Sequence, residues 1–500
     1  MESEIIRQLF FRPSLSDNYG AKDYRDKRAL YELMDDLIHR SGLDDQFIKL
    51  VLEHRQLTPD KVGHRFLNHC ITAFRTNIVR FVENHLPVRE LSIQLADSKL
   101  MQWFCYVAEF GSILAPSKST LDRYGRFLPQ DKIDQLSVQL LQAAGQKSEG
   151  NLEQTLGLDQ PVNLSNVWLD TFCLKANIHF PVDWVLLIDA TRTLTKATLL
   201  IRNSGLKNRM PQSPEEFLRD MNKLGIAMGQ QRRQRDSKRN RKKILRLMKR
   251  IVRRIQQHAQ KHRDMLETRW RETGWSQSQA QQIQERIDGI LTQLPIAEKQ
   301  AHERMIGGRQ VKSSEKILSL YESEVQVIVR GKLSAEVEFG NQVLLVEQED
   351  GLLMHLQLHE KVVSDSKILI QGVESIQERY GIELEGVCGD RGFGSKANEE
   401  MLGEEADYIC PRPIEALREK MKNSEFARRQ RRRSQTEGRI SILVHRFLGD
   451  LLRVKGLENR ETAIGWARLS HNVWKLAQMR KKQAEERERE RERERERQAA

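Results

Sequence analysis

Hydrophobic residues in the first 150 positions recur at spacings of three and four, which is the period of an amphipathic helix. The segments Arg28–His39 and Gly63–Glu83 show this pattern most clearly, and proline is sparse around them. We therefore expect residues 1–150 to form an all-helical N-terminal region.

One part of this region, residues 88–128, has the pattern of a helix-turn-helix unit. Two apolar-rich stretches, Glu90–Asp97 and Leu100–Phe110, precede a loop at Gly111–Pro116. A Ser-Lys-Ser-Thr cluster then provides a helix N-cap. The helix that follows would present three basic side chains to DNA phosphates or bases, namely Lys118, Arg123 and Arg126. A purely structural helical bundle is the alternative.

Beyond residue 163 the pattern changes to short apolar runs that favour strands. Val167–Asp170 and Trp184–Asp189 are rich in β-forming residues and predict two buried strands. Helical periodicity returns from Phe217 to Leu294. Strands are predicted after Tyr321 at Val325–Arg330, Ala335–Glu347, Leu352–Leu358, Leu384–Gly389 and Asp407–Cys410. Helices are predicted at Ser364–Tyr380, Gln435–Leu452 and Glu461–Met479.

Charge is concentrated in the central helical region. Between Gln230 and Arg271 there are 17 Lys or Arg residues and 3 Asp or Glu residues, whereas the net charge of the whole chain is +13. One predicted helix has an apolar stripe through Leu245, Met248 and Val252 and a cationic face made of Arg246, Lys249, Arg250, Arg253 and Arg254. Such a concentrated basic surface is typical of a nucleic-acid partner. A solvated helix face is the alternative.

Composition excludes several classes of protein. The longest apolar run, Trp103–Ala108, is six residues, so no membrane helix is expected, and the acidic start lacks the features of a secretory signal. Five cysteines without a CxxC pair argue against a disulfide framework or a zinc ribbon and favour the reducing cytoplasm. The tail from Glu485 to Arg497 contains seven Glu and six Arg residues, which predicts a solvated helix or a disordered segment.

Three carboxylates lie where the surrounding pattern predicts no exposed charge. Asp170 and Asp390 each end a predicted strand, and Gly389 and Gly392 leave room around Asp390. Glu437 opens a predicted helix and, counted back from Ile440, falls on its inward stripe. Because a buried, uncompensated carboxylate is costly, we expect the three to converge on hard divalent cations. As alternatives, Glu437 complements a helix dipole, and Asp170 and Asp390 are turn or cap residues.

Several stretches resemble bacterial insertion-sequence transposases of the DDE class with a long insertion between the first two acids. Residues 88–127 resemble the N-terminal helical domain of these enzymes. Five further stretches carry the resemblance, in this order: 170–183 (DTFCLKANIHFPVD), 337–345 (VEFGNQVLL), 389–393 (GDRGF), 435–440 (QTEGRI) and 471–477 (HNVWKLA).

This resemblance implies a mixed α/β fold with an RNase H-like catalytic core. The core would comprise residues 163–205 and 321–480, interrupted by a basic helical insertion at 206–320 and followed by a Glu/Arg tail at 481–500. The implied catalytic and metal-binding triad is Asp170, Asp390 and Glu437, holding two Mg²⁺ or Mn²⁺ ions. Arg433 matches a family arginine and would contact DNA, whereas Gln430 and Val444 depart from the family pattern. Asp365 and Asp183 are alternates for the acids of this triad, but Asp365 fits better as the N-cap of the following helix.

The implied activity is metal-dependent DNA strand cleavage and strand transfer. The expected partners are double-stranded DNA, as transposon ends and as target, and further copies of the chain on that DNA. A bacterial cytoplasmic location on the nucleoid follows, and because GxxxxGK[ST] is absent we expect no nucleotide cofactor. A catalytically inactive, transposase-derived DNA-binding protein is the alternative, and a helical scaffold for protein partners is a third.

Overall fold

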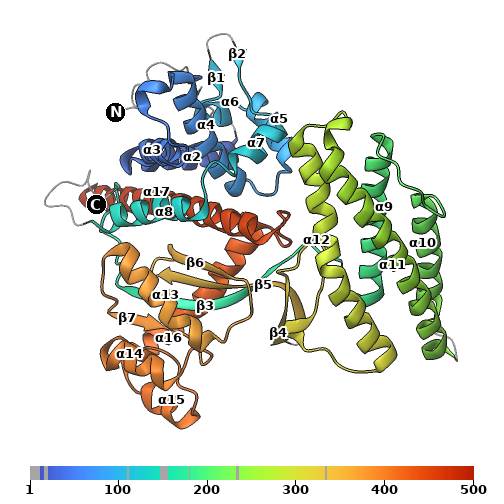
Figure 1. The fold of residues 1–500 in the computed structure, drawn as a ribbon. Coiled ribbons are helices and arrows are strands. Elements are labelled where there is room, and N and C mark those ends of the chain that lie inside the picture. The colour runs from blue at the N-terminus through green and yellow to red at the C-terminus, as the bar shows by residue number, and fades with distance from the viewer. Residues whose placement is uncertain are drawn as a thin grey trace. The chain divides into compact units, whose positions relative to one another are not determined.

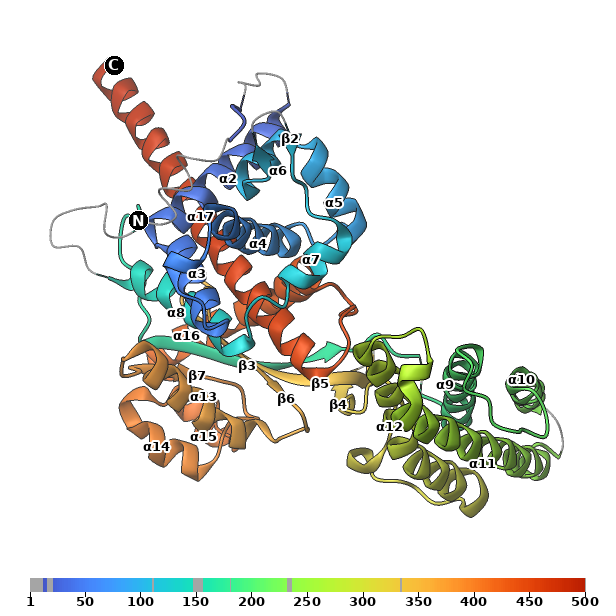
Figure 2. The ribbon, with the colours of Figure 1, turned by 45° about the horizontal axis from the view of Figure 1, so that its top comes forward.

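The computed structural model describes residues 12–15, 21–109, 112–146, 156–179, 181–231, 236–332 and 335–499 (Figures 1 and 2). The fold is mixed α/β and rich in helix, as the sequence predicts. The chain divides into two compact units. Unit 1 contains the described residues of Met1–Leu174, Gln342–His359 and Val363–Ala500, and unit 2 contains those of Lys175–Asn341 and Glu360–Val362.

The N-terminal part of unit 1 is a helical bundle with a small β-hairpin. Its elements are α2 (Lys22–Arg40), α3 (Leu43–His54), α4 (His64–Val82), α5 (Val88–Asp97), α6 (Lys99–Cys105), β1 (Ala108–Glu109), β2 (Ser112–Ile113), α7 (Lys118–Tyr124) and α8 (Gln130–Gly145). The apolar-rich stretch Leu100–Phe110 is helical only as far as Cys105, because α6 ends where Tyr106 adopts a left-handed conformation. The first strand of the hairpin, β1, follows it. The predicted cap is confirmed, since Ser117 Oγ accepts from the Thr120 amide at 3.3 Å.

A five-stranded sheet lies in the described part of the chain. Its strands are β3 (Asn166–Lys175), β4 (Gln326–Lys332), β5 (Ala335–Gln348), β6 (Leu353–His359) and β7 (Gly386–Cys388). The order is β4-β5-β3-β7, and β6 also pairs with β5. β5 is antiparallel to β4 and to β6, whereas β3 and β7 are parallel. The predicted strand Asp407–Cys410 is only a single bridge between Asp407 and Val387.

The remaining helices of unit 1 follow the sheet strands. They are α13 (Asp365–Tyr380), α14 (Lys396–Ala406), α15 (Ile414–Lys420), α16 (Ser424–Ile442), the π-helix Leu443–Leu448 and α17 (Leu457–Ala499). The sheet and the N-terminal helices share one hydrophobic core, which includes Val167, Leu345 and Trp466.

The long C-terminal helix α17 joins the N-terminal helices to the sheet within unit 1 (Figure 2). Asn472 is fully buried and exchanges two hydrogen bonds with the backbone of Leu353 in β6, at 2.8 and 2.9 Å. The His471–Ala477 motif is therefore explained by packing. The Glu/Arg tail continues α17 as an exposed helix. Of the two structures predicted for it, the solvated helix is therefore the one observed, and not the disordered segment.

Unit 2 is built around four helices, α9 (Asp183–Asn203), α10 (Pro214–Gln230), α11 (Ser237–Arg269) and α12 (Gln277–His302). The predicted strand Trp184–Asp189 is wrong, because these residues form the start of α9. Its buried positions, among them Leu187, Leu194 and Ile201, follow helical spacing over the whole segment. The unit begins at Lys175, so it includes α9, and its main segment continues to Asn341, whereas the resemblance implies an insertion at 206–320.

In the described part of the chain, every helix is too short or too polar to cross a lipid bilayer.

Candidate functional site

The parallel pair β3 and β7 places two of the predicted acids at matching positions. The strands pair Asn166 with Gly386 and Trp168 with Cys388. Continued by two residues, the same register sets Asp170 opposite Asp390. The prediction that Asp170 ends its strand is wrong, because β3 continues to Lys175 and Asp170 lies in its middle. Asp390 does follow the end of β7 at Cys388, and the extended register sets it beside Asp170.

Helix α16 packs against these two strands through specific polar contacts. Trp168 of β3 donates its indole N–H to the Arg429 carbonyl at 3.0 Å. Gln430 Nε2 donates to the carbonyl of Tyr408 at 2.6 Å. Gly386 has no room for a side chain, since a Cβ there would lie 1.8 Å from Arg429 Nη1 and 2.5 Å from Asn166 Oδ1. The helix is therefore fixed in position relative to the ends of β3 and β7.

A buried ion cluster also fastens α16 to the sheet. Glu347 of β5 is fully buried and accepts hydrogen bonds from Arg432 Nη1 at 2.6 Å and from Thr436 Oγ1 at 2.7 Å. Its second oxygen accepts from Arg439 Nε at 3.2 Å. The Arg432 guanidinium also lies 4.5 Å from the centre of the Trp168 ring. Arg432 and Arg439 are thus structural and not available to a ligand.

The prediction that Glu437 opens a helix and faces inward is wrong on both counts. Helix α16 begins at Ser424, more than three turns earlier, because Asn423 caps it by accepting from two backbone amides. The buried position in this turn is Thr436, and Glu437 is exposed. A dipole effect no longer accounts for this acid, since such effects fade within the first turn.

The three predicted acids nevertheless interact electrostatically. The pKa of Asp170 is raised to about 6, chiefly by burial, and the charges of Asp390 and Glu437 raise it further. The Thr171 amide, 2.7 Å from Asp170 Oδ1, and the Arg433 guanidinium oppose this shift. Arg433 Nε is itself buried and has no hydrogen-bond partner in the described part of the chain. The structure thus brings Asp170, Asp390, Glu437 and Arg433 into one electrostatic environment.

A fourth acid, Asp365, lies beside this cluster. The N-cap of α13 is Ser364, not Asp365 as predicted, and Asp365 occupies the first turn. Its Oδ1 accepts from Thr171 Oγ1 and from Gln342 Nε2, both at 3.1 Å. A Cβ on Gly392 would lie 2.7 Å from Asp365 Oδ2 and 3.0 Å from Asp390 Oδ1. The absence of a side chain at Gly392 is what allows these two carboxylates to approach each other.

Asp365 thus joins the candidate site, although its sequence pattern indicates only a helix cap. The signal that points to it is its place just after β6, a buried strand of the same sheet as β3. Loops held by a rigid scaffold carry a disproportionate share of binding and catalytic residues, and such a loop joins β6 to α13 at Asp365.

The carboxylate oxygens of the site suit a hard divalent cation by chemical type, but their spacing in the described residues does not form a complete site for one. Asp170 Oδ1 accepts from the Thr171 amide and Asp390 Oδ1 accepts from the Gly392 amide at 2.7 Å, so one oxygen of each is already fixed. Among the described residues, no three acidic, histidine or cysteine side chains are gathered closely enough to ligate one ion. Burial is the main cause of the raised pKa of Asp170, and repulsion from Asp390 and Glu437 adds to it. A cation between the carboxylates would relieve that repulsion.

Two of the three predicted N-terminal DNA contacts line a basic hollow in unit 1. The hollow has a volume of about 680 Å³, and Lys118 and Arg126 lie on its wall. Its other basic residues come from three further segments of unit 1: Arg80, Arg89, Arg453 and Lys455. Arg123 is not part of it and instead donates to Thr120 Oγ1 at 3.1 Å.

The predicted cationic face of α11 is only partly open. Arg246, Arg250, Arg253 and Arg254 are exposed. Lys249 lies instead against α12, where Glu298 is 3.6 Å away, and the same acid pairs with Arg253 at 3.3 Å. Lys249 is therefore held by the fold of unit 2 and is not a free contact for DNA.

No protein-family model, curated protein or solved structure matches this chain.

Proposed function

We propose that the protein is a DNA transposase of the DDE class, with an RNase H-like core in which Asp170, Asp390 and Glu437 act together. The observation that carries this proposal is the shared environment of the three acids in the middle of β3, just after β7 and on α16. The mixed sheet, antiparallel at β5–β6 and parallel at β3–β7, is the kind of core that the sequence resemblance implies.

In this proposal the three acids hold one or two Mg²⁺ or Mn²⁺ ions, and Asp365 keeps the Thr171 side of the site in place. Bound metal would activate the attacking hydroxyl and stabilise the leaving oxygen of a phosphoryl displacement. Arg433, beside Asp170, would neutralise a non-bridging phosphate oxygen of the scissile strand. The Arg433 Nε is buried without a hydrogen-bond partner among the described residues, and a phosphate oxygen that reached it would satisfy this donor.

The basic residues around the hollow at Lys118 and Arg126 would bind the phosphates of double-stranded DNA, both transposon ends and target. Cutting and joining two ends requires two active sites, so we propose that copies of the chain assemble on the DNA. A bacterial cytoplasmic location on the nucleoid belongs to the same proposal.

The test is cleavage of DNA taken from both sides of the protein's own gene, in Mg²⁺. We expect Asp390→Asn to reduce cleavage by at least about 1000-fold, since an amide supplies no charge to hold the metal. DNA binding should change little. The matched control is Glu374→Gln, which neutralises an exposed acid on α13 and should cleave at the wild-type rate.

Two results would count against the proposal. Cleavage by the Asp390→Asn variant at the wild-type rate would remove Asp390 from the site. Tight DNA binding without any cleavage by the wild-type protein would favour the transposase-derived, non-catalytic DNA-binding protein.

A further inference from the structure

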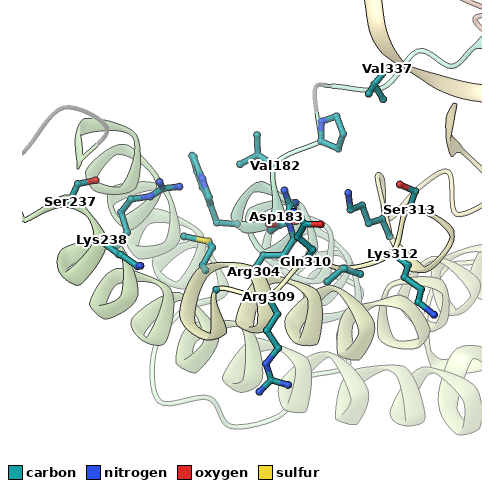
Figure 3. A pocket seen from close by; sticks show the side chains of 17 residues that line it. Val182, Asp183, Ser237, Lys238, Arg304, Arg309, Gln310, Lys312, Ser313 and Val337 are labelled. Carbon is teal, nitrogen blue, oxygen red and sulfur yellow. Dashed lines mark hydrogen bonds and ion pairs between the residues drawn. The ribbon is translucent and has the colours of Figure 1, made fainter. Parts of the chain in front are cut away.

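A second basic hollow lies entirely within unit 2. Two of its residues, Lys238 and Arg241, belong to the basic segment Gln230–Arg271, but none of the individual DNA contacts predicted from the sequence lines it. It has a volume of about 1300 Å³. The start of α9, the start of α11 and the segment 304–316 line it, together with Val337 of β5 (Figure 3). Its six cationic side chains are Lys238, Arg241, Arg304, Arg309, Lys312 and Lys316.

The single acid in this wall, Asp183, is already neutralised. Arg304 Nη1 donates to both carboxylate oxygens, at 2.8 and 2.9 Å, and Gln300 Nε2 donates to one of them at 2.9 Å. Figure 3 shows this Asp183–Arg304 pair in the middle of the hollow, with Lys238 to one side and Lys312 to the other. The pair is therefore internal, and the surrounding cations determine the potential of the hollow.

Most of those cations have no acidic partner. Arg309 pairs with Glu303 at 3.2 Å, but in the described part of the chain Lys238, Arg241, Lys312 and Lys316 form no ion pair. Arg241 Nε is also buried without a hydrogen-bond partner among the described residues. Four unpaired positive charges around one hollow give it a positive potential, which concentrates anions there.

The walls of the hollow are fastened to each other. Lys242 of α11 donates from Nζ to the carbonyl of Ile306 at 2.8 Å, which ties the segment after α12 to the start of α11. Gln300 also holds this region, because its side chain bonds both to Asp183 and to the backbone of Ile317. The cations are thus presented by a preformed surface and not by a free tail.

We propose that this hollow binds the phosphate backbone of DNA. The unpaired cations stand on both sides of a neutral centre, as a row of phosphates requires, whereas a single small anion needs donors around one point. The indole of Trp184 in the wall gives a sugar or base a surface to contact. The inference rests on the proposed function and deepens it by adding a second DNA surface to the unit that carries the predicted cationic face of α11.

The experiment compares the full-length protein with the triple variant Lys238→Gln, Lys312→Gln, Lys316→Gln by fluorescence anisotropy on a random-sequence DNA duplex. If each lysine meets a phosphate, the slope of log K against log[salt] should fall by about 0.9 for each lysine replaced, and affinity at low salt should drop at least about tenfold. Thermal melts verify that the variant is folded.

The matched control is Lys196→Gln, Lys207→Gln, Lys299→Gln, which removes three exposed lysines of the same unit from outside the hollow. An unchanged salt slope in the hollow variant, or an equal decrease in the control, would overturn the proposal. Cleavage at saturating DNA separates this outcome from failure of the catalytic proposal, since it depends on Asp170, Asp390 and Glu437 and not on these lysines.

Discussion

Asp170→Asn is expected to make the protein more stable at pH 7 while removing its cleavage activity. Burial, then Asp390 and Glu437, raise the pKa of Asp170 to about 6 from an ordinary 3.8. At about 1.4 kcal/mol per pKa unit, keeping this carboxylate ionised costs the folded state about 3 kcal/mol at pH 7. An amide of the same shape is neutral and avoids most of that cost.

The sign of the pH dependence follows from the raised pKa. Between pH 6 and pH 4 the folded protein binds a proton that the unfolded chain does not, so this group favours folding more as the pH falls. The wild type should therefore recover stability relative to Asp170→Asn through that window. Thermal denaturation of both proteins at pH 7 and pH 4.5 measures the difference. An Asn variant that is less stable at pH 7, or a difference that does not shrink at the lower pH, would show that burial does not destabilise the Asp170 carboxylate.

Glu347→Ala should have the largest destabilising effect among the site's supporting residues. It removes the only charge that accepts from both Arg432 and Arg439 in the described structure, and Glu347 is fully buried. Breaking a buried ion pair by removing one partner costs about 3–5 kcal/mol, because the remaining charges stay buried and unpaired. Since the cluster fastens α16 to the sheet, Arg433 and Glu437 should also lose their positions, and cleavage should disappear with them.

The matched control for this change is Glu349→Ala, only two residues away. The side chain of Glu349 is exposed and pairs with the exposed Arg428 at 3.1 Å. Surface pairs of this kind contribute about 0–1 kcal/mol. Urea denaturation should therefore separate the two variants by at least about 2 kcal/mol. Equal effects would show that the buried cluster does not hold α16.

Much of the fold was predictable from local pattern, and the errors have physical causes. The strands β3, β5 and β6 alternate or run apolar over enough residues to be recognised, and their predicted bounds differ from the observed ones by a few residues. The strand predicted at Trp184–Asp189 is wrong because a short apolar run does not distinguish a buried strand from a buried helix. Only the longer helical spacing through Leu194 and Ile201 decides between them.

The candidate site was predictable to a similar degree. Asp390 was found because it follows a buried strand, whereas Asp170 was found although its predicted strand end is wrong, since β3 continues to Lys175. The strand register places the two acids together. The start of α16 was missed because its first turns are rich in arginine and lack an apolar stripe. The side chains of Arg429 and Arg432 are nevertheless largely buried, where Arg429 contacts Asn166 of β3 and Arg432 pairs with Glu347 of β5. Asp365 was misjudged because a cap and a site residue look alike until Thr171 and Gln342 are seen to contact it.

Whether the three acids hold a cation together is decided by the effect of Mn²⁺ on the thermal stability of the wild type and of Glu437→Gln. Glu437 is exposed in the body of α16, so the substitution should change stability without metal by no more than about 0.5 kcal/mol. If Asp170, Asp390 and Glu437 share a cation, Mn²⁺ should raise the melting temperature of the wild type by binding the folded state. The Gln variant should gain much less and should not cleave DNA. Equal Mn²⁺-induced shifts in the two proteins, with cleavage retained by the variant, would contradict the shared cation site.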